Sequence, residues 1–202
     1  MRTKTLLLTA ALSAAGLATS MAQVYSVNAV GYIKLTLPAG FTMVANQLNN
    51  ADNKLNTLFP GAGFGDTVFK FNPASGFESS VFFGEWSPNL TLNPGEGAFY
   101  QAGAASEAVL VGEVPQGNGL KVSLVSGFQI ISSIVPQSAK LEDLGMPADF
   151  GDTVFFFRNG AYESSVFFGA WSPDAVPKVG EAFWLQRGGG AADWTRNFSV
   201  NP

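Results

Sequence analysis

Apolar and polar residues alternate along much of this chain, and the alternation has a period of two. The segments 33–37 and 120–124, Ile-Lys-Leu-Thr-Leu and Leu-Lys-Val-Ser-Leu, place every apolar side chain on one face. This pattern is typical of a β-strand with one face in water. A three-residue link that ends in Gly40 or Gly127 follows each segment. Because glycine accepts the left-handed backbone conformation, we expect each segment to form a hairpin with the apolar run that comes next.

Two short stretches have helical spacing instead. Segment 55–59 places apolar residues at i, i+3 and i+4 behind the cap candidates Asp52 and Asn53. Segment 141–144 repeats the leucine spacing behind Ser138, with acidic residues in the first turn. Capping side chains and early acidic residues favour the start of a helix. The sequence therefore predicts one helix of one or two turns at each place.

The other apolar runs are short and are separated by turn residues. Pro94 and Gly95 fit the two central positions of a type II turn, and Gly180 keeps the glycine in a similar stretch later in the chain. Proline presets the negative φ of that turn and glycine accepts the positive one. The runs with strand character are 66–71, 79–83, 98–101, 108–114, 183–186 and 194–200.

The chain contains an internal duplication. Segment 78–88, ESSVFFGEWSP, recurs as 163–173, ESSVFFGAWSP, with ten of eleven residues identical at an offset of 85 positions. Segment 64–69 recurs unchanged as 150–155, and the offset drifts from 87 to 85 along the chain. The period, near 86, is longer than the periods of solenoid repeats.

We therefore predict an all-β fold with one short helix per repeat. Two homologous repeats, 23–115 and 116–202, are expected to pack as a pseudo-twofold β-sandwich or barrel-like body. Segment 109–114 aligns with the end of the second repeat and also with the start of the first. A strand that served both purposes would give the halves a common edge, so we expect the halves to pack as one body.

The N-terminus has a different pattern. Arg2 and Lys4 precede the mainly apolar run 6–18, which is followed by Ser-Met-Ala at 20–22. This is the order of a secretory signal peptide, and the run is shorter than the roughly 20 residues of a membrane-spanning helix. We predict a cleaved signal at 1–22, no membrane insertion, and an exported protein in the periplasm, at the cell surface or outside the cell.

Removal of this signal takes away two basic residues and no acidic one, which changes the formal net charge from −4 to −6. An acidic chain lacks the cations that neutralise phosphates. Nucleic acid is therefore not expected as a partner.

Several short motifs are shared with a known group of proteins. They are Gly-Phe-x-x-x-Ala-Asn at 40–46, Leu-Phe-Pro at 58–60, Pro-Gly-Glu-Gly at 94–97, Val-Gly-Glu-Val-Pro-Gln-Gly at 111–117 and Trp-Thr-Arg-Asn-Phe-Ser-Val at 194–200. In these motifs the chain resembles a family of exported bacterial proteins with a duplicated β-domain. The resemblance covers nearly the whole mature chain and implies export and duplication. That family has no established activity, so the resemblance supplies no catalytic residues.

The composition excludes several kinds of chemistry. The chain has no His and no Cys. Ser-His-Asp and Cys-His catalytic sites are therefore excluded, as are zinc, copper and haem sites with His or Cys ligands. We expect neither a metal nor a cofactor. Without disulfides, the stability of the fold must come from buried apolar surface.

Carboxylates are the remaining candidates for catalysis. A glycoside hydrolase needs two of them, roughly 5 to 10 Å apart across a cleft. The acidic residues that recur in both repeats are Asp66 and Asp152, Glu78 and Glu163, and Glu96 and Glu181. Local backbone needs explain them as well, since those after glycine or at a turn exit accept bonds from turn amides.

Aromatic residues are the candidates for binding. Trp86 and Trp171 lie in repeated Trp-Ser-Pro turns, and Tyr100 and Trp184 lie near strand ends. Aromatic faces at the surface of a β-scaffold stack on sugar rings or peptide side chains, whereas in a disulfide-free domain they also fill the core. The candidate ligand-binding residues are Trp86, Trp171, Tyr100, Trp184, Glu78 and Glu163.

The leading hypothesis from sequence is a non-enzymatic exported structural or adhesive β-protein. Its Trp-bearing turns would bind polysaccharide or envelope components, with polysaccharide or other surface proteins as partners. The alternative is a carboxylate-only glycoside hydrolase or a related hydrolase. An outer-membrane barrel is a third hypothesis, which the short and irregular strands disfavour.

Overall fold

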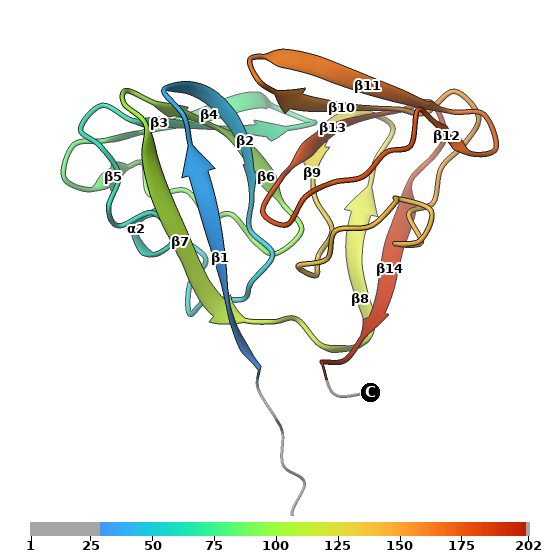
Figure 1. Ribbon diagram of the computed structural model, residues 1–202, viewed down its shortest axis with the longest axis horizontal. Helices are drawn as coiled ribbons and strands as arrows, with labels where there is room; N and C mark the ends of the chain where they lie inside the picture. Colours follow the sequence, from blue (N-terminus) through green and yellow to red (C-terminus); the bar gives the residue numbers. More distant parts are fainter. Residues whose placement is uncertain (1–28, 201–202) are drawn as a thin grey trace, which may run out of the picture.

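The computed structural model describes residues 29–200, and the predicted signal peptide at 1–22 lies outside them. The described chain is almost entirely β-structure, with one helix, α2 (Leu55–Leu58) (Figure 1). The strands are β1 (Val30–Leu37), β2 (Gly40–Ala45), β3 (Thr67–Asn72), β4 (Gly76–Phe82), β5 (Trp86–Ser87), β6 (Gly97–Ala102), β7 (Ser106–Glu113), β8 (Gly117–Leu124), β9 (Gly127–Ile131), β10 (Thr153–Arg158), β11 (Ala161–Phe167), β12 (Trp171–Ser172), β13 (Phe183–Arg187) and β14 (Ala192–Phe198).

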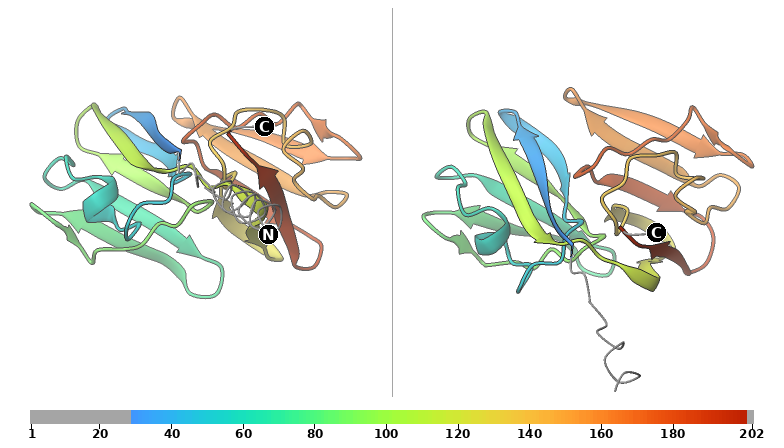
Figure 2. Two further views of the ribbon diagram at one scale, coloured as in Figure 1. Left: turned by 90° about the horizontal axis from the view of Figure 1, so that it is seen from below. Right: turned by 60° about the horizontal axis from the view of Figure 1, so that its bottom comes forward.

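The strands form four antiparallel sheets, two in each half of the molecule. The first half, residues 29–115, holds the sheet β2-β6-β3-β4-β5 and the pair β1-β7; the second half, residues 116–200, holds β9-β13-β10-β11-β12 and the pair β8-β14. Figures 1 and 2 show the halves side by side. The strands follow one order in both five-stranded sheets, and each sheet has two ends. The all-β prediction is therefore confirmed, whereas the barrel-like alternative is wrong because neither sheet closes.

The predicted hairpins are wrong, although their glycines behave as expected. Gly40 and Gly127 have φ of 93° and 88°, but β1 pairs with β7 and β2 pairs with β6. The tight link is a corner at which the chain passes from one sheet to the other. The cause lies in the strand faces: β1 has one buried face, whereas successive residues Met43, Val44 and Ala45 of β2 are all buried. A strand that is apolar on both faces belongs in a sheet covered on both sides.

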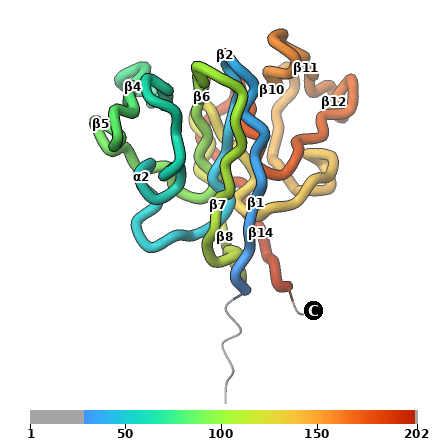
Figure 3. Tube along the Cα trace, turned by 60° about the vertical axis from the view of Figure 1, so that its left-hand side comes forward, coloured from blue at the N-terminus to red at the C-terminus, as the bar shows by residue number. Residues whose placement is uncertain are grey.

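The pairing of β7, the last strand of the first half, shows which of the two alignments of segment 109–114 applies. Among the described residues, β7 pairs with β1 alone, and the two strands run side by side in the view of Figure 3. The strand therefore closes the first half and gives no edge to the second.

The helix prediction is confirmed only in the first half, and there the cap candidates Asp52 and Asn53 are wrong, because the N-cap of α2 is Lys54, whose side chain makes no capping hydrogen bond. In the second half, the Leu144 amide donates to the Lys140 carbonyl at 2.9 Å, but residues 141–145 form a turn and no helix. Gly145 has φ of 68°, and the Met146 amide bonds back to the Leu141 carbonyl at 2.9 Å. A left-handed glycine closes a helix, so the segment ends after a single turn.

Both predicted glycine turns are present. Gly95 and Gly180 have φ of 90° and 79°, and the amide after each glycine donates to a carbonyl three residues back, at 2.9 and 3.1 Å. Each turn reaches across to the other half. The Ala45 amide donates to the Gly180 carbonyl, and the Ser132 amide donates to the Gly95 carbonyl, both at 2.9 Å.

Close packing at these turns explains why both positions hold glycine. A Cβ atom on Gly180 would lie 2.4 Å from Leu35 Cδ2, and a Cβ atom on Gly95 would lie 2.6 Å from Val122 Cγ2. Each turn therefore presses its backbone against the two-stranded sheet of the other half. A side chain at either position would push the halves apart.

Three hydrophobic clusters hold the molecule together. Two of them fill the space between the five-stranded and two-stranded sheets of each half. The third joins the halves and consists of Met43, Ala45, Phe99, Ile130 and Ala182. The halves are therefore in direct apolar contact, through the faces of the five-stranded sheets that turn away from their own cores.

Candidate ligand-binding site

The two tryptophans of the repeated turns are core residues. Trp86 and Trp171 are 2% and 3% exposed, and each belongs to the hydrophobic cluster of its own half. The expectation that these turns display tryptophan faces to a ligand is therefore wrong. The backbone of each turn lies at the surface, but the large ring points inward, where Trp86 Nε1 donates to the Phe59 carbonyl at 3.0 Å. Burial of this much apolar surface outweighs the superficial position of the turn.

Tyr100 is also buried, with 1% exposure. Its hydroxyl donates to Asp66 Oδ2 at 2.6 Å. Burial and this hydrogen bond raise the pKa of Tyr100 well above its usual range. The residue therefore acts as a neutral donor inside the first half and offers no ring to a ligand.

The buried aspartates accept hydrogen bonds from backbone amides, as the explanation by local backbone needs predicts. Asp66 accepts from the amides of Gly63 at 2.8 Å and Gly103 at 2.9 Å. Asp152 accepts from the amides of Asp149 and Gly188, both at 2.9 Å. Neither carboxylate is available as a surface acid or base, since the two are 3% and 0% exposed.

The carboxylates at the turn exits are engaged in ion pairs. Glu96 Oε2 lies 2.9 Å from Lys70 Nζ, and Glu181 binds Arg158 through two bonds of 2.6 Å. The bidentate pair with Glu181 is the main cause of the raised pKa of Arg158. Each carboxylate also accepts an amide of its own turn, at 2.6 Å from Asn93 and 2.9 Å from Lys178. Both glutamates therefore stabilise their turns.

Glu78 and Glu163 are exposed and lie on strands β4 and β11. Glu78 is opposite Lys70, and Glu163 accepts from Arg158 Nη1 at 3.2 Å. Because side chains alternate along a strand, both point away from the sheet face that carries their neighbours Phe77 and Tyr162. In the described chain, no group of three or more acidic side chains is placed to hold a metal ion.

Trp184 is the one predicted aromatic that reaches an open surface. It is half-buried on β13, and its ring packs against aromatic rings of both halves. The centroid distances are 4.8 Å to Phe71, 6.0 Å to Phe77 and 6.0 Å to Phe128. Trp184 therefore stands where the two five-stranded sheets meet.

Beside Trp184 lie two neighbouring hollows on either side of Tyr162, which we call the two lobes of the aromatic groove. The larger lobe has a volume of about 510 Å³ and the smaller about 400 Å³, within the roughly 300 to 1,000 Å³ of small-molecule sites. Tyr162 lines both lobes. All nine lining residues are aromatic: Phe41, Phe69, Phe77, Phe99, Phe128, Phe155, Phe157, Tyr162 and Trp184.

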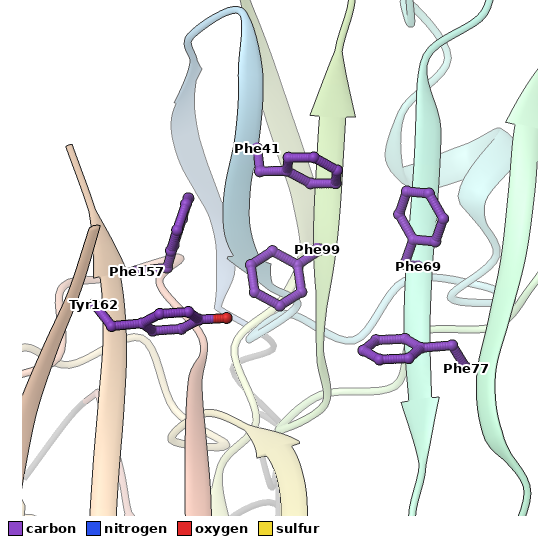
Figure 4. A pocket seen from close by; sticks show the side chains of 6 residues that line it. All are labelled: Phe41, Phe69, Phe77, Phe99, Phe157 and Tyr162. Carbon is purple, nitrogen blue, oxygen red and sulfur yellow. The ribbon is translucent and has the colours of Figure 1, made fainter. Parts of the chain in front are cut away.

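Strand alternation places these rings. In β3, Val68 faces the core of the first half, whereas Phe69 on the opposite face reaches the groove. In β10, Val154 and Phe155 are divided between core and groove in the same way. Figure 4 shows rings from both halves facing one another across the larger lobe. No charged side chain lines either lobe, so the groove within the described chain is an uncharged, apolar surface.

The sequence contained a signal for this groove that we did not use. Phe41, Phe69, Phe77 and Phe99 align with Phe128, Phe155, Tyr162 and Trp184 at the offsets of the duplication. Three of them, Phe99, Phe155 and Trp184, occur on strands whose other face is also mainly apolar. Because a strand needs only one apolar face to cover a core, a second aromatic face indicates another contact surface.

Two further pairs of phenylalanines are exposed outside the groove. Phe64 and Phe83 are 81% and 60% exposed, and Phe150 and Phe168 are 79% and 59% exposed. Within each pair the ring centroids lie 5.0 Å apart. The two rings of each pair cover part of each other, and most of their apolar area stays in contact with water.

We expect Phe64→Ser to lower the free energy of unfolding by less than about 1 kcal/mol, because substitutions at exposed sites seldom cost more. Urea denaturation followed by circular dichroism measures the change. A loss of about 3 kcal/mol or more, the size typical of a buried phenylalanine, would contradict the exposed placement.

Residues 29–200 contain no helix that is long and apolar enough to cross a membrane. Comparisons with protein families, with curated proteins and with solved structures found no match to this chain.

Proposed function

We propose that this chain is a non-enzymatic, exported binding protein in which two copies of one β-module are related by an approximate twofold axis. The ligand site is the aromatic groove between them, and the ligand is an uncharged molecule with a hydrocarbon body. The observation that carries the proposal is the lining of the groove, which within residues 29–200 consists of nine aromatic side chains and no charged one.

Three observations support the two-module part of the proposal. The sequence repeats with a period near 86, and the two five-stranded sheets follow one strand order. The bonds from Ala45 to Gly180 and from Ser132 to Gly95 are reciprocal, with equal lengths of 2.9 Å. The resemblance to exported bacterial proteins with a duplicated β-domain agrees with this arrangement. Retention of both copies follows if each supplies one wall of a shared site.

The chemistry of the lining selects the ligand class. A fatty-acid carboxylate or a cationic head group would lose its water in the groove and gain no counter-ion there, which costs several kcal/mol. A sugar polymer would need hydrogen-bond partners for many hydroxyl groups, and the lining offers only a phenol and an indole N–H. Of the ligands considered from the sequence, an apolar envelope component therefore fits better than a polysaccharide.

The intrinsic fluorescence of the protein provides a test. The chain has four tryptophans, and Trp86, Trp171 and Trp194 are at most 3% exposed, which leaves Trp184 as the one that a quencher can reach. We expect the uncharged probe N-phenyl-1-naphthylamine to bind with micromolar affinity and to protect Trp184 from acrylamide. 1-Decanol should displace the probe, whereas decanoate and decyltrimethylammonium should do so at least tenfold more weakly.

Matched variants separate the groove from other apolar surface. Phe41→Glu places a charge in the groove wall and should weaken probe binding at least tenfold, whereas Phe64→Glu, at an exposed site elsewhere, should leave it unchanged. Both residues are partly or largely in water, at 46% and 81% exposure, so both variants should fold. Probe binding that is absent, or equal in the two variants, would refute the groove as the site.

A further inference from the structure

The larger lobe contains one polar atom among its side chains, the hydroxyl oxygen of Tyr162. Figure 4 shows this hydroxyl pointing into the lobe, toward the space between Phe99 and Phe77. The ring is held by an edge contact with Phe157 at a centroid distance of 5.1 Å and by a second one with Phe155 at 6.4 Å. The hydroxyl makes no hydrogen bond with any residue in 29–200, and Tyr162 is 54% exposed, so a ligand that covers this residue must replace the hydrogen bond of the hydroxyl to water.

Trp184 supplies the second polar atom. Its indole Nε1 also makes no hydrogen bond within the described chain, and the residue lines the smaller lobe together with Tyr162. The corresponding residues of the first half, by the offset of the duplication, are Phe77 and Phe99, which have no polar atoms. The lining residues of the second half therefore include a phenol hydroxyl and an indole N–H where those of the first half have only phenyl rings.

The Tyr162 hydroxyl constrains the ligand. A phenol hydroxyl is a good hydrogen-bond donor, and no other side chain of the larger lobe has a polar atom. We infer that the ligand carries a neutral oxygen acceptor, such as an ester or ketone carbonyl, which takes a hydrogen bond from Tyr162 in the larger lobe. This inference rests on the proposed function and adds the polar group to the hydrocarbon body.

A pair of ligands with similar hydrocarbon bodies, one with and one without a strong acceptor, tests the inference. Methyl decanoate and 1-chlorodecane have similar hydrocarbon bodies, but only the ester has a strong acceptor. In competition against N-phenyl-1-naphthylamine, we expect the wild-type protein to bind the ester about tenfold more tightly, the factor that one net hydrogen bond provides. Tyr162→Phe should remove most of this preference and leave the affinity for 1-chlorodecane within twofold.

The duplication offers conservative control variants. Tyr162→Phe and Trp184→Phe each place the residue of the first half at the matching position of the second, so the fold should tolerate both. Trp184→Phe, which removes a donor outside the larger lobe, should leave the preference for the ester unchanged, and Phe77→Tyr, which adds a hydroxyl, should not reduce it. Near-ultraviolet circular dichroism checks that the aromatic packing is intact in each variant.

The outcomes distinguish this inference from the proposed function. If the wild-type protein binds both ligands with equal affinity, or if Tyr162→Phe weakens both equally, the groove is an apolar site and the inference is wrong. If the wild-type protein binds neither ligand nor the probe, the proposed function is wrong and the inference fails with it. A preference for the ester that disappears in Tyr162→Phe alone supports both.

Discussion

Gly97→Ala is expected to lower the free energy of unfolding by about 3 kcal/mol, the upper part of the range for overpacked cores. Gly97 begins β6 and is buried between the halves. A Cβ atom there would lie 2.3 Å from the Cβ atom of Ala182 and 2.9 Å from Ile130 Cγ2. The backbone of Gly97 is not in the left-handed region, so alanine strains only the packing. Urea denaturation measures the loss.

The matching position of the second half provides the control. By the offset of the duplication, Gly97 corresponds to Ala182, so the contact joins one residue without a side chain to one with a methyl group. Ala182→Gly alone should cost about 1 kcal/mol, through lost packing and greater backbone freedom. The double variant moves the methyl group to the other side and should recover at least half of the loss in Gly97→Ala. If the two losses simply add, the contact between the halves does not cause the effect.

The sequence was sufficient to predict which segments form strands and which glycines form turns. Alternation over residues 33–37 and the glycines at 40 and 95 act locally, so the information lies within a few neighbouring residues. Which strands pair with each other could not be predicted from the same local patterns. A link such as 38–40 is compatible with a hairpin and with a corner between sheets, and the choice depends on whether β2 is covered on one face or on both. That covering comes from the other half, which a local pattern does not contain.

The candidate site could be predicted only in part. The prediction selected tryptophans by residue type and by position in a turn, and it found Trp184 but also chose the buried Trp86 and Trp171. A turn fixes the backbone at the surface and leaves the direction of the side chain open. The groove is formed by phenylalanines of two sheets, and neither sheet forms it alone. Residues such as Phe69 and Phe155 become a site only through the packing of the halves.

The two halves differ in the partner of the buried aspartate. In the first half, Asp66 is paired with the neutral hydroxyl of Tyr100 at 2.6 Å. In the second half, Asp152 is paired with the guanidinium of Arg187, whose Nη1 lies 3.1 Å from Oδ2. The aspartate and its turn amides are common to both halves. The residues of β6 in the first half and of β13 in the second therefore decide whether the buried carboxylate has a neutral or a cationic partner.

This difference predicts unequal costs for one substitution. Asp152→Asn removes the buried carboxylate that faces Arg187, a side chain 5% exposed, and leaves Asp149, which is 55% exposed, as its remaining anion. An unpaired buried charge costs about 3 to 5 kcal/mol, and because Arg187 keeps this one exposed anion, we expect a loss of about 3 kcal/mol in the free energy of unfolding. Asp66→Asn disturbs only neutral donors and should cost about 2 kcal/mol.

Urea denaturation of both variants at neutral pH measures the two costs on one scale. Because both aspartates accept two turn amides, loss of those bonds contributes about equally and cancels in the difference. The remaining difference in the free energy of unfolding comes from the partner side chain, which is Arg187 on β13 or Tyr100 on β6. Arg187→Ala in the Asp152→Asn background removes the stranded cation and should restore part of the stability. Equal costs for the two single variants, or a further loss in the double variant, would show that Arg187 does not depend on Asp152 for its charge balance.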